Sequence, residues 1–174
     1  MGDPRFPIGA FSLEGDITPE RLKAFVDDIA AAPAQFRAAV AHLSPAQLDT
    51  QYRAGGWTIR QVIHHVADSH MNSYIRFRLA LTEDNPTIKP YDEAKWAELH
   101  DAHTADVEIS LRIIEAVHER WTLLVRSLSP IQWLRTFNHP ERGVVRLDAT
   151  AAMYSWHCKH HLAHITTLCT ERGW

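Results

Sequence analysis

Four histidines fall within eight residues near the carboxyl end of the chain. They are His157, His160, His161 and His164, in the stretch YSWHCKHHLAHITTL. Residues four apart on a helix share a face, so His157 pairs with His161, and His160 pairs with His164. Two imidazoles at this spacing can chelate one metal ion, as the histidine pair of known zinc motifs does. Helical spacing predicts a metal site here and leaves both pairs open.

A third ligand must come from another part of the chain. The segment VIHHVADSH contains His64, His65 and His70, and a helical bundle can bring such a segment against the last helix. Without a metal, a group of buried imidazoles would leave many donors and acceptors to satisfy in apolar surroundings. The pattern therefore favours a three-histidine metal site. Surface or hydrogen-bonded core positions are expected for the scattered histidines His100, His103, His118 and His139.

The segments that must position these histidines have the hydrophobic spacing of helices. Long helices are predicted over residues 16–43, 57–83, 107–128 and 149–170. Pro33 is expected to break or kink the first of them. Asp148 is expected to cap the last helix, and Gly173 follows its end. The predicted apolar stripe of the third helix consists of Ile109, Ile113, Val117, Trp121, Leu124 and Leu128.

The connections between these helices differ in length. Residues 84–106 contain two prolines and form a long connection, in which we expect a short helix at 92–99 and, from IKPYDEAKW, the lip of a pocket. Residues 135–147 fit a small β-hairpin that turns at PERG. The sequence thus predicts an all-α protein, a four-helix bundle with a long crossover between helices 2 and 3 and short accessory elements. We expect one domain over residues 1–174, with an extended arm at 1–16.

Composition excludes several classes of partner. The net charge is −3, with basic residues scattered along the chain, so nucleic acid is not expected as a partner. No apolar run reaches the roughly 18 residues of a membrane span, and the start MGDPRFPIGAF lacks the features of a signal peptide. Cys158 and Cys169 would lie roughly 16 Å apart along one helix, too far for a disulfide. A cytoplasmic protein with reduced thiols is predicted.

The sequence resembles the DinB-like superfamily of metal-binding four-helix bundles, and most closely its YfiT branch. The matching stretches run over nearly the whole chain in the same order; they are FPIG (6–9), GGWTIRQVIHHVADSHMNSYIRFRLALTED (55–84), IKPYDEAKWAEL (88–99) and WHCKHHLAHI (156–165). The resemblance implies a bundle that holds one divalent metal ion through three histidines. It also implies a homodimer and a small-molecule substrate.

The resemblance selects among the open ligand pairs. Aligned on HLAHI, its two last-helix ligands fall on His157 and His161, and His164 takes a position where many relatives carry glutamine. The remaining ligand, eight residues after Trp57, falls on His65. Zinc is the expected ion, although nickel, iron and manganese also accept histidine ligands.

Three functions are compatible with such a site. The first is a metal-dependent hydrolase, in which the ion activates a bound water. The second is a thiol S-transferase that uses a low-molecular-weight thiol such as bacillithiol, as related families do. The third is a metal-binding bundle without catalysis. His160 and His164 are candidates for proton transfer or for supporting a ligand, and Asp68, three residues after His65, is a candidate for orienting an imidazole.

Overall fold

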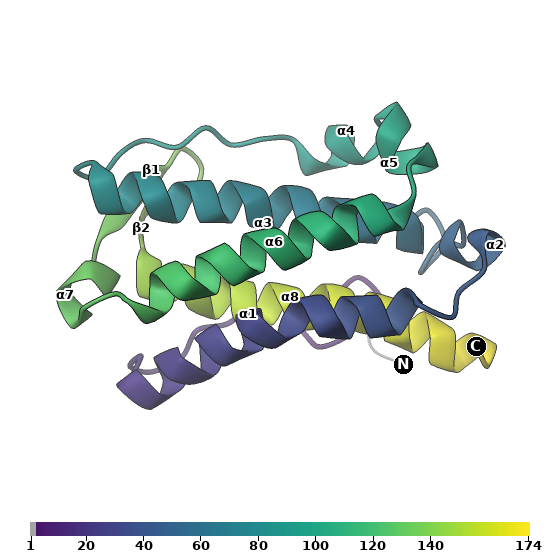
Figure 1. The fold of residues 1–174 in the computed structure, drawn as a ribbon, viewed down its shortest axis with the longest axis horizontal. Helices are drawn as coiled ribbons and strands as arrows, with labels where there is room; N and C mark the ends of the chain where they lie inside the picture. Colours follow the sequence, from purple (N-terminus) through teal and green to yellow (C-terminus); the bar gives the residue numbers. More distant parts are fainter. Residues whose placement is uncertain (1–2) are drawn as a thin grey trace.

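The computed structural model describes residues 3–174 as a bundle of four long helices with short accessory elements (Figure 1). The long helices are α1 (Pro19–Val40), α3 (Ile59–Thr82), α6 (Val107–Arg126) and α8 (Leu147–Arg172). The short elements are α2 (Pro45–Leu48), α4 (Glu93–Ala97), α5 (His100–Thr104), α7 (Pro130–Trp133), β1 (Thr136–His139) and β2 (Gly143–Arg146). The predicted four-helix bundle is confirmed, and β1 and β2 pair in the expected antiparallel hairpin.

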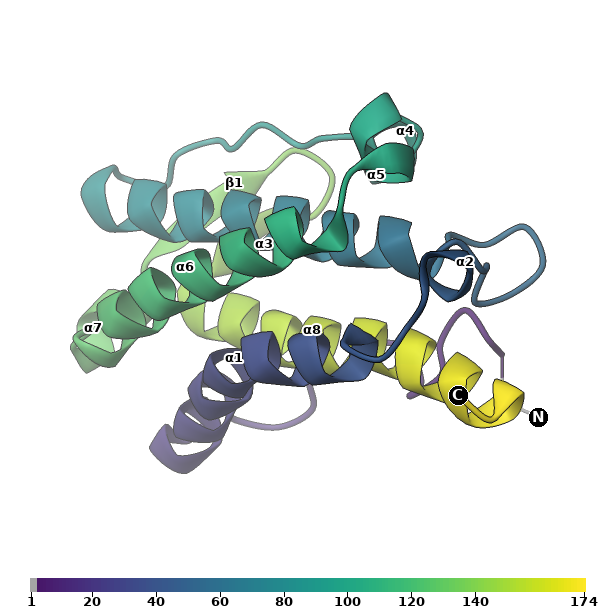
Figure 2. The ribbon, with the colours of Figure 1, turned by 45° about the vertical axis from the view of Figure 1, so that its right-hand side comes forward.

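The long helices follow an order that requires a crossover. Helix α1 packs against α6 and α8, and α3 packs against the same two helices. Figures 1 and 2 show that α3 and α6 run in the same direction, whereas α1 and α8 run in the other. Since α3 and α6 are successive long helices, the chain between them must return along the length of the bundle. The predicted long crossover, which carries α4 and α5, makes this return.

Helix boundaries follow local capping signals, with one difference from expectation. Thr18 accepts a hydrogen bond from an amide of the first turn of α1, and Gly173 ends α8 in a left-handed conformation with φ of 67°. Asp148 does not cap α8, because the helix already begins at Leu147. Asp148 is buried in the first turn, where Arg146 donates to its carboxylate with an Nε–Oδ1 distance of 3.0 Å.

Pro33 does not break α1, which continues as one element to Val40. A proline has no amide hydrogen, so it leaves the carbonyl four residues earlier without its helical partner. That carbonyl belongs to Ile29, and it accepts a hydrogen bond from Nδ1 of His118 on α6 at 2.6 Å. A side chain from a neighbouring helix therefore replaces the missing backbone donor, and the helix continues through Pro33 without a break.

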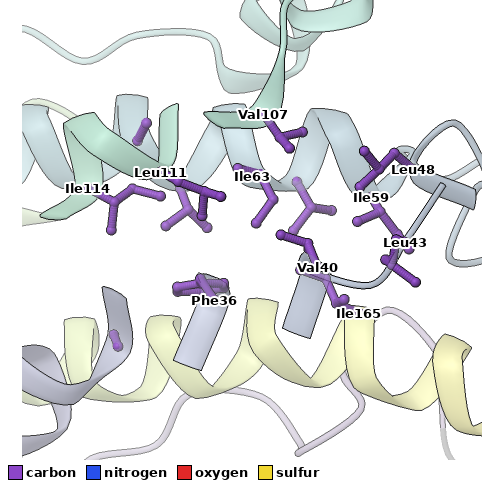
Figure 3. Packing of buried hydrophobic residues seen from close by; sticks show 14 of the residues in the cluster. Phe36, Val40, Leu43, Leu48, Ile59, Ile63, Val107, Leu111, Ile114 and Ile165 are labelled. Carbon is purple, nitrogen blue, oxygen red and sulfur yellow. The ribbon is translucent and has the colours of Figure 1, made fainter. Parts of the chain in front are cut away.

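The hydrophobic core fills the space between the four helices (Figure 3). Phe36, Ile59, Ile63 and Ile114 are each 0% exposed, and residues of all four long helices contribute. The face of α3 toward the core carries Ile59, Val62, Ile63 and Val66, which are all buried. Within residues 3–174, no helix is both long enough and apolar enough to cross a membrane.

The buried face of α6 differs from the predicted stripe. Ile109 is 47% exposed, and Trp121 alone of the predicted stripe is buried. The face toward the core carries Val107, Ser110, Leu111, Ile114, His118, Trp121, Thr122 and Val125. Hydrophobic spacing failed because Ser110 and His118 are polar but face the core, where hydrogen bonds to other helices satisfy them.

The amino-terminal arm lies against α8. Residues 3–17 form turns and extended segments without a helix or strand. Trp156 of α8 donates its Nε1 hydrogen to the carbonyl of Gly9 at 3.2 Å, and His164 of α8 contacts the carbonyl of Arg5 at 3.3 Å. The arm therefore covers the face of α8 that carries Trp156 and His164.

We predict that Ile63→Ala lowers the free energy of unfolding by about 2–5 kcal/mol, because it leaves a cavity at a fully buried position. Urea unfolding followed by circular dichroism measures this loss. The matched control is Ile131→Ala, whose side chain is 71% exposed and which should change stability by less than about 0.5 kcal/mol. Equal effects of the two substitutions would contradict the observed packing.

Candidate metal centre

Three imidazoles from the two helices α3 and α8 converge. His65 lies on α3, and His157 and His161 lie one turn apart on α8. The Nε2 atom of His157 is 3.4 Å from Nε2 of His65 and 3.2 Å from Nε2 of His161. One ligand atom from each of the three residues lies within 4.8 Å of the others. The structure thus brings together the three residues that the resemblance selected.

Burial keeps these imidazoles neutral. Loss of solvation, followed by the nearby imidazoles of His160 and His164, lowers the pKa of His65 to about 4. Burial, followed by the neighbouring imidazoles, also holds the pKa of His157 and of His161 well below the usual value. At neutral pH each ring therefore has a nitrogen lone pair to offer, and this is the protonation state that binds metal.

The geometry of the three nitrogens fits a metal ion. Two nitrogens bound at about 2.0–2.1 Å to a tetrahedral ion lie roughly 3.3–3.4 Å apart. The two measured Nε2–Nε2 distances, 3.4 and 3.2 Å, are close to this separation. Three neutral imidazoles are a donor set that suits zinc and other first-row divalent metals. The residues present therefore fit the implied metal.

A second group of histidines on α8 shares a member with the first. His160, His161 and His164 also place ligand atoms within 4.8 Å of one another. His161 and His164 approach through their Nδ1 atoms at 3.4 Å, and Nε2 of His164 lies 3.3 Å from the carbonyl of Arg5. His160 stacks on Trp156, and its buried Nδ1 has no hydrogen-bond partner in residues 3–174. The two pairs that helical spacing left open, His157 with His161 and His160 with His164, therefore each belong to a group that could hold a metal ion.

A cavity of about 360 Å³ opens beside both groups. The expected lip from the crossover is confirmed at Pro90, Tyr91 and Glu93. The remaining lining residues are Arg5, Tyr52, Trp57, His65, Ser69, Arg76, His139, Glu141, Arg142, Met153, Tyr154, Trp156, His157, His160, His161 and His164. The histidine groups therefore face a space that admits a small molecule with both charged and aromatic contacts.

His64 and His70, the other candidates on α3, point away from the converging nitrogens. His64 bonds to Ser110 Oγ at 2.7 Å and to the carbonyl of Ala105 at 3.2 Å. His70 is fully buried and lies behind His157, with its Nε2 3.0 Å from the Nδ1 of that ligand candidate. His70 is therefore placed to support His157 through a hydrogen bond to its second ring nitrogen.

Asp68 does not take the position that the sequence suggested. Burial, with a contribution from Asp101, raises the pKa of its carboxyl to about 6. In the part of the chain that the structure describes, its carboxylate bonds to no histidine and does not line the cavity. The geometry therefore gives no support for an orienting role toward His65.

Two aromatic contacts and one histidine contact escaped sequence reasoning. Tyr52 stacks on His164 with ring centroids 4.0 Å apart, and Trp57 packs against His65 at 4.7 Å. His118 was expected to be a surface or hydrogen-bonded core residue; it is buried, and its Nε2 lies 2.6 Å from Nδ1 of His70. No local pattern signals these contacts, because their partners are distant in the chain.

Comparison with known proteins assigns the family. The sequence model of the DinB superfamily matches residues 28–165. This chain belongs to the DinB superfamily. Within the superfamily, it is 52% identical over 170 residues to the "Putative metal-dependent hydrolase OB0782" of Oceanobacillus iheyensis, covering 98% of both chains. It is 51% identical over 174 residues to a protein of Bacillus mycoides with the same description, covering 100% of both.

Two solved structures share the fold. YfiT from Bacillus subtilis, described as a probable metal-dependent hydrolase with an unusual four-helix bundle topology, superposes with a TM-score of 0.95 at 46% identity, covering 98% of both chains. A mycothiol-dependent maleylpyruvate isomerase superposes with a TM-score of 0.66 at 19% identity, covering 83% of this chain and 60% of that one. The second likeness shows the fold alone.

We predict that the metal-free protein loses stability as the pH falls from about 6.5 to about 4. Burial lowers the pKa of His65 and of His118 to about 4. The unfolded chain takes up protons near pH 6.5, where these histidines stay neutral in the folded protein, so acid favours unfolding. Urea unfolding of chelator-treated protein across this range measures the slope.

The control for this titration is His42→Ala, whose exposed side chain should leave the slope unchanged. Stability that stayed constant across the whole window would show that the buried histidines are protonated in the folded state, contrary to the expected result.

Proposed function

We propose that this protein is a metal-dependent hydrolase whose divalent ion, zinc as first choice, is held by His65, His157 and His161. The observation that carries the proposal is the convergence of three neutral imidazoles, with Nε2–Nε2 distances of 3.4 and 3.2 Å, beside a cavity of about 360 Å³. The descriptions of the Oceanobacillus, Bacillus mycoides and Bacillus subtilis relatives support metal dependence and hydrolysis. Nickel, iron or manganese would also suit this donor set.

The three ligands determine what chemistry the site supplies. Because neutral imidazoles do not offset its charge, a bound divalent ion would polarise a substrate carbonyl and lower the pKa of water to about 7. His65 arrives from α3, whereas His157 and His161 arrive from α8, so packing of these helices sets the spacing of the donors. Packing also excludes bulk water from one side of the site, because His161 is only 7% exposed.

His160 is our candidate for proton transfer. Its Nδ1 is buried without a partner among the described residues, and its ring lines the cavity. Burial lowers the pKa of His160 to about 4, so the ring is neutral and a weak base near pH 7, and a protonated ring would release its proton readily. His164 contacts His161 on one side and the Arg5 carbonyl on the other, so we assign it a supporting role.

The cavity indicates a small polar substrate. The charged side chains Arg76, Arg142, Glu93 and Glu141 line it together with aromatic rings. Both signs of charge are present, so the lining suits a molecule that carries polar groups of more than one kind. The homodimer and the cytoplasmic location implied by the sequence stay predictions.

Metal content tests the ligand assignment. Protein purified without a histidine tag should contain about one divalent ion per chain, and His65→Ala, His157→Ala and His161→Ala should each lose most of it. His64→Ala is the matched control, because His64 neighbours a proposed ligand but bonds to Ser110. Elemental analysis of the purified proteins gives the stoichiometry. Full metal retention by all three ligand variants would overturn the assignment.

Reaction class is tested separately on the metal-loaded protein. A panel of esters and amides is compared with a panel of low-molecular-weight thiols, each mixed with an electrophilic acceptor. The proposal expects turnover of at least one ester or amide, and loss of that turnover in His157→Ala. Turnover in the thiol panel alone would assign a thiol S-transferase instead, and a metal-loaded protein inactive in both panels would indicate a binding function.

A further inference from the structure

A chain of three imidazoles crosses the bundle behind the metal centre. Nδ1 of His157 lies 3.0 Å from Nε2 of His70, and Nδ1 of His70 lies 2.6 Å from Nε2 of His118. Nδ1 of His118 lies 2.6 Å from the carbonyl oxygen of Ile29. His157, His70, His118 and Ile29 lie on α8, α3, α6 and α1, so the chain joins all four long helices.

The last member of this chain fixes the direction of every bond in it. A carbonyl oxygen only accepts, so His118 must donate through Nδ1. A neutral imidazole carries one hydrogen, so Nε2 of His118 then accepts from Nδ1 of His70. By the same argument, Nε2 of His70 accepts from Nδ1 of His157. The Nε2 atom of His157 is therefore left without a hydrogen, and it is the atom that faces His65 and His161.

Water cannot reverse this order from within the core. His70 is 0% exposed and His118 is 1% exposed, so solvent does not compete for their nitrogens. Protonating either ring would place a charge in an apolar interior beside other imidazoles, at a large desolvation cost. Both rings therefore stay neutral near physiological pH, and the one-hydrogen rule holds along the chain.

Pro33 explains why the Ile29 carbonyl is available. In an uninterrupted helix, the amide of residue 33 would donate to the carbonyl of residue 29. Pro33 has no amide hydrogen, so the Ile29 carbonyl lacks its helical donor and takes the hydrogen of His118 Nδ1 instead. The position of one proline on α1 thus supplies the acceptor on which the direction of the chain depends.

A second, shorter chain of hydrogen bonds sets the tautomer of His161, the other proposed ligand on α8. The carbonyl of Arg5 lies 3.3 Å from Nε2 of His164, and Nδ1 of His164 lies 3.4 Å from Nδ1 of His161. Donation to the carbonyl leaves Nδ1 of His164 to accept from Nδ1 of His161. The Nε2 atoms of His157 and His161 then face each other at 3.2 Å without a hydrogen between them, an arrangement that a cation stabilises.

We infer that His70 and His118 are positioning residues that hold His157 in the tautomer that binds metal through Nε2, with Pro33 freeing the carbonyl that sets this tautomer. The inference rests on the proposed metal site. Residues that support a histidine ligand through its second nitrogen typically change metal affinity by about 10–100-fold when they are replaced. His118 would exert this effect without touching the ligand itself, since His70 lies between them.

The direct test is made on the wild-type protein. Nitrogen-15 NMR of the metal-free protein near neutral pH distinguishes the two neutral tautomers of each histidine, and His157→Gln identifies the signals of His157. The expected result is His157 with its hydrogen on Nδ1. A hydrogen on Nε2 of His157 in the metal-free protein would overturn the inference, even if the protein bound zinc stoichiometrically.

Substitution of His118 tests the long-range effect. His118→Phe removes both nitrogens from a buried position, so His157 should show a mixture of tautomers, and the zinc dissociation constant should rise about 10–100-fold. The matched control is Thr122→Val, one turn further along α6, which removes a buried hydrogen bond to the His118 carbonyl but leaves the imidazole chain intact. A single Nδ1–H tautomer and unchanged zinc affinity in His118→Phe would contradict the inference.

Pro33→Ala tests whether the proline sets the direction of the hydrogen bonds along the imidazole chain. The new amide hydrogen competes with His118 for the Ile29 carbonyl, so zinc affinity should fall, by less than in His118→Phe. Unchanged tautomer populations in Pro33→Ala would show that the proline does not set the direction. If the wild-type protein bound no zinc but kept His157 protonated on Nδ1, the proposed function would fail and the imidazole chain would stand.

Discussion

Hydrogen bonds of two buried histidines, His70 and His118, tie the four long helices of the bundle together. His70 and His118 bring four ring nitrogens into the core, where each unsatisfied one would cost about 1–3 kcal/mol. All four have partners within 3.0 Å. Because those partners lie on other helices, the bonds fix how α1, α3, α6 and α8 sit against one another. The same bonds determine which nitrogen of His157 faces His65 and His161.

Bundle topology explains why the candidate metal site is covered by the connection between α3 and α6. Helices α3 and α6 run in the same direction, so the connection between them has to travel back along the molecule (Figure 2). On its way it passes over α3, which carries His65, and contributes Pro90, Tyr91 and Glu93 to the cavity. An up-and-down bundle with short loops would leave this face of α3 uncovered. The covering of the site is thus a consequence of helix direction.

Local signals in the sequence predict the helices, but they miss the interactions that make the site. The four long helices, the crossover and the hairpin follow from periodicity, capping residues and turn residues. Spacing on α8 indicated a chelating pair, and the family resemblance was needed to prefer His157 with His161. The prediction of the buried face of α6 was wrong because His118 is polar but faces the core. The hydrogen bonds of His118 join residues that are distant in the chain, and the hydrophobic spacing within one helix does not predict such bonds.

Pro33 and His118 form a pair with evolutionary consequences. Each is unfavourable in isolation, since a proline inside a helix leaves a carbonyl without its donor and a buried imidazole needs an acceptor. Together they satisfy each other. Selection on either position should therefore depend on the other, and relatives are expected to gain or lose the two residues jointly. Such co-variation would indicate the contact between α1 and α6 from sequences alone.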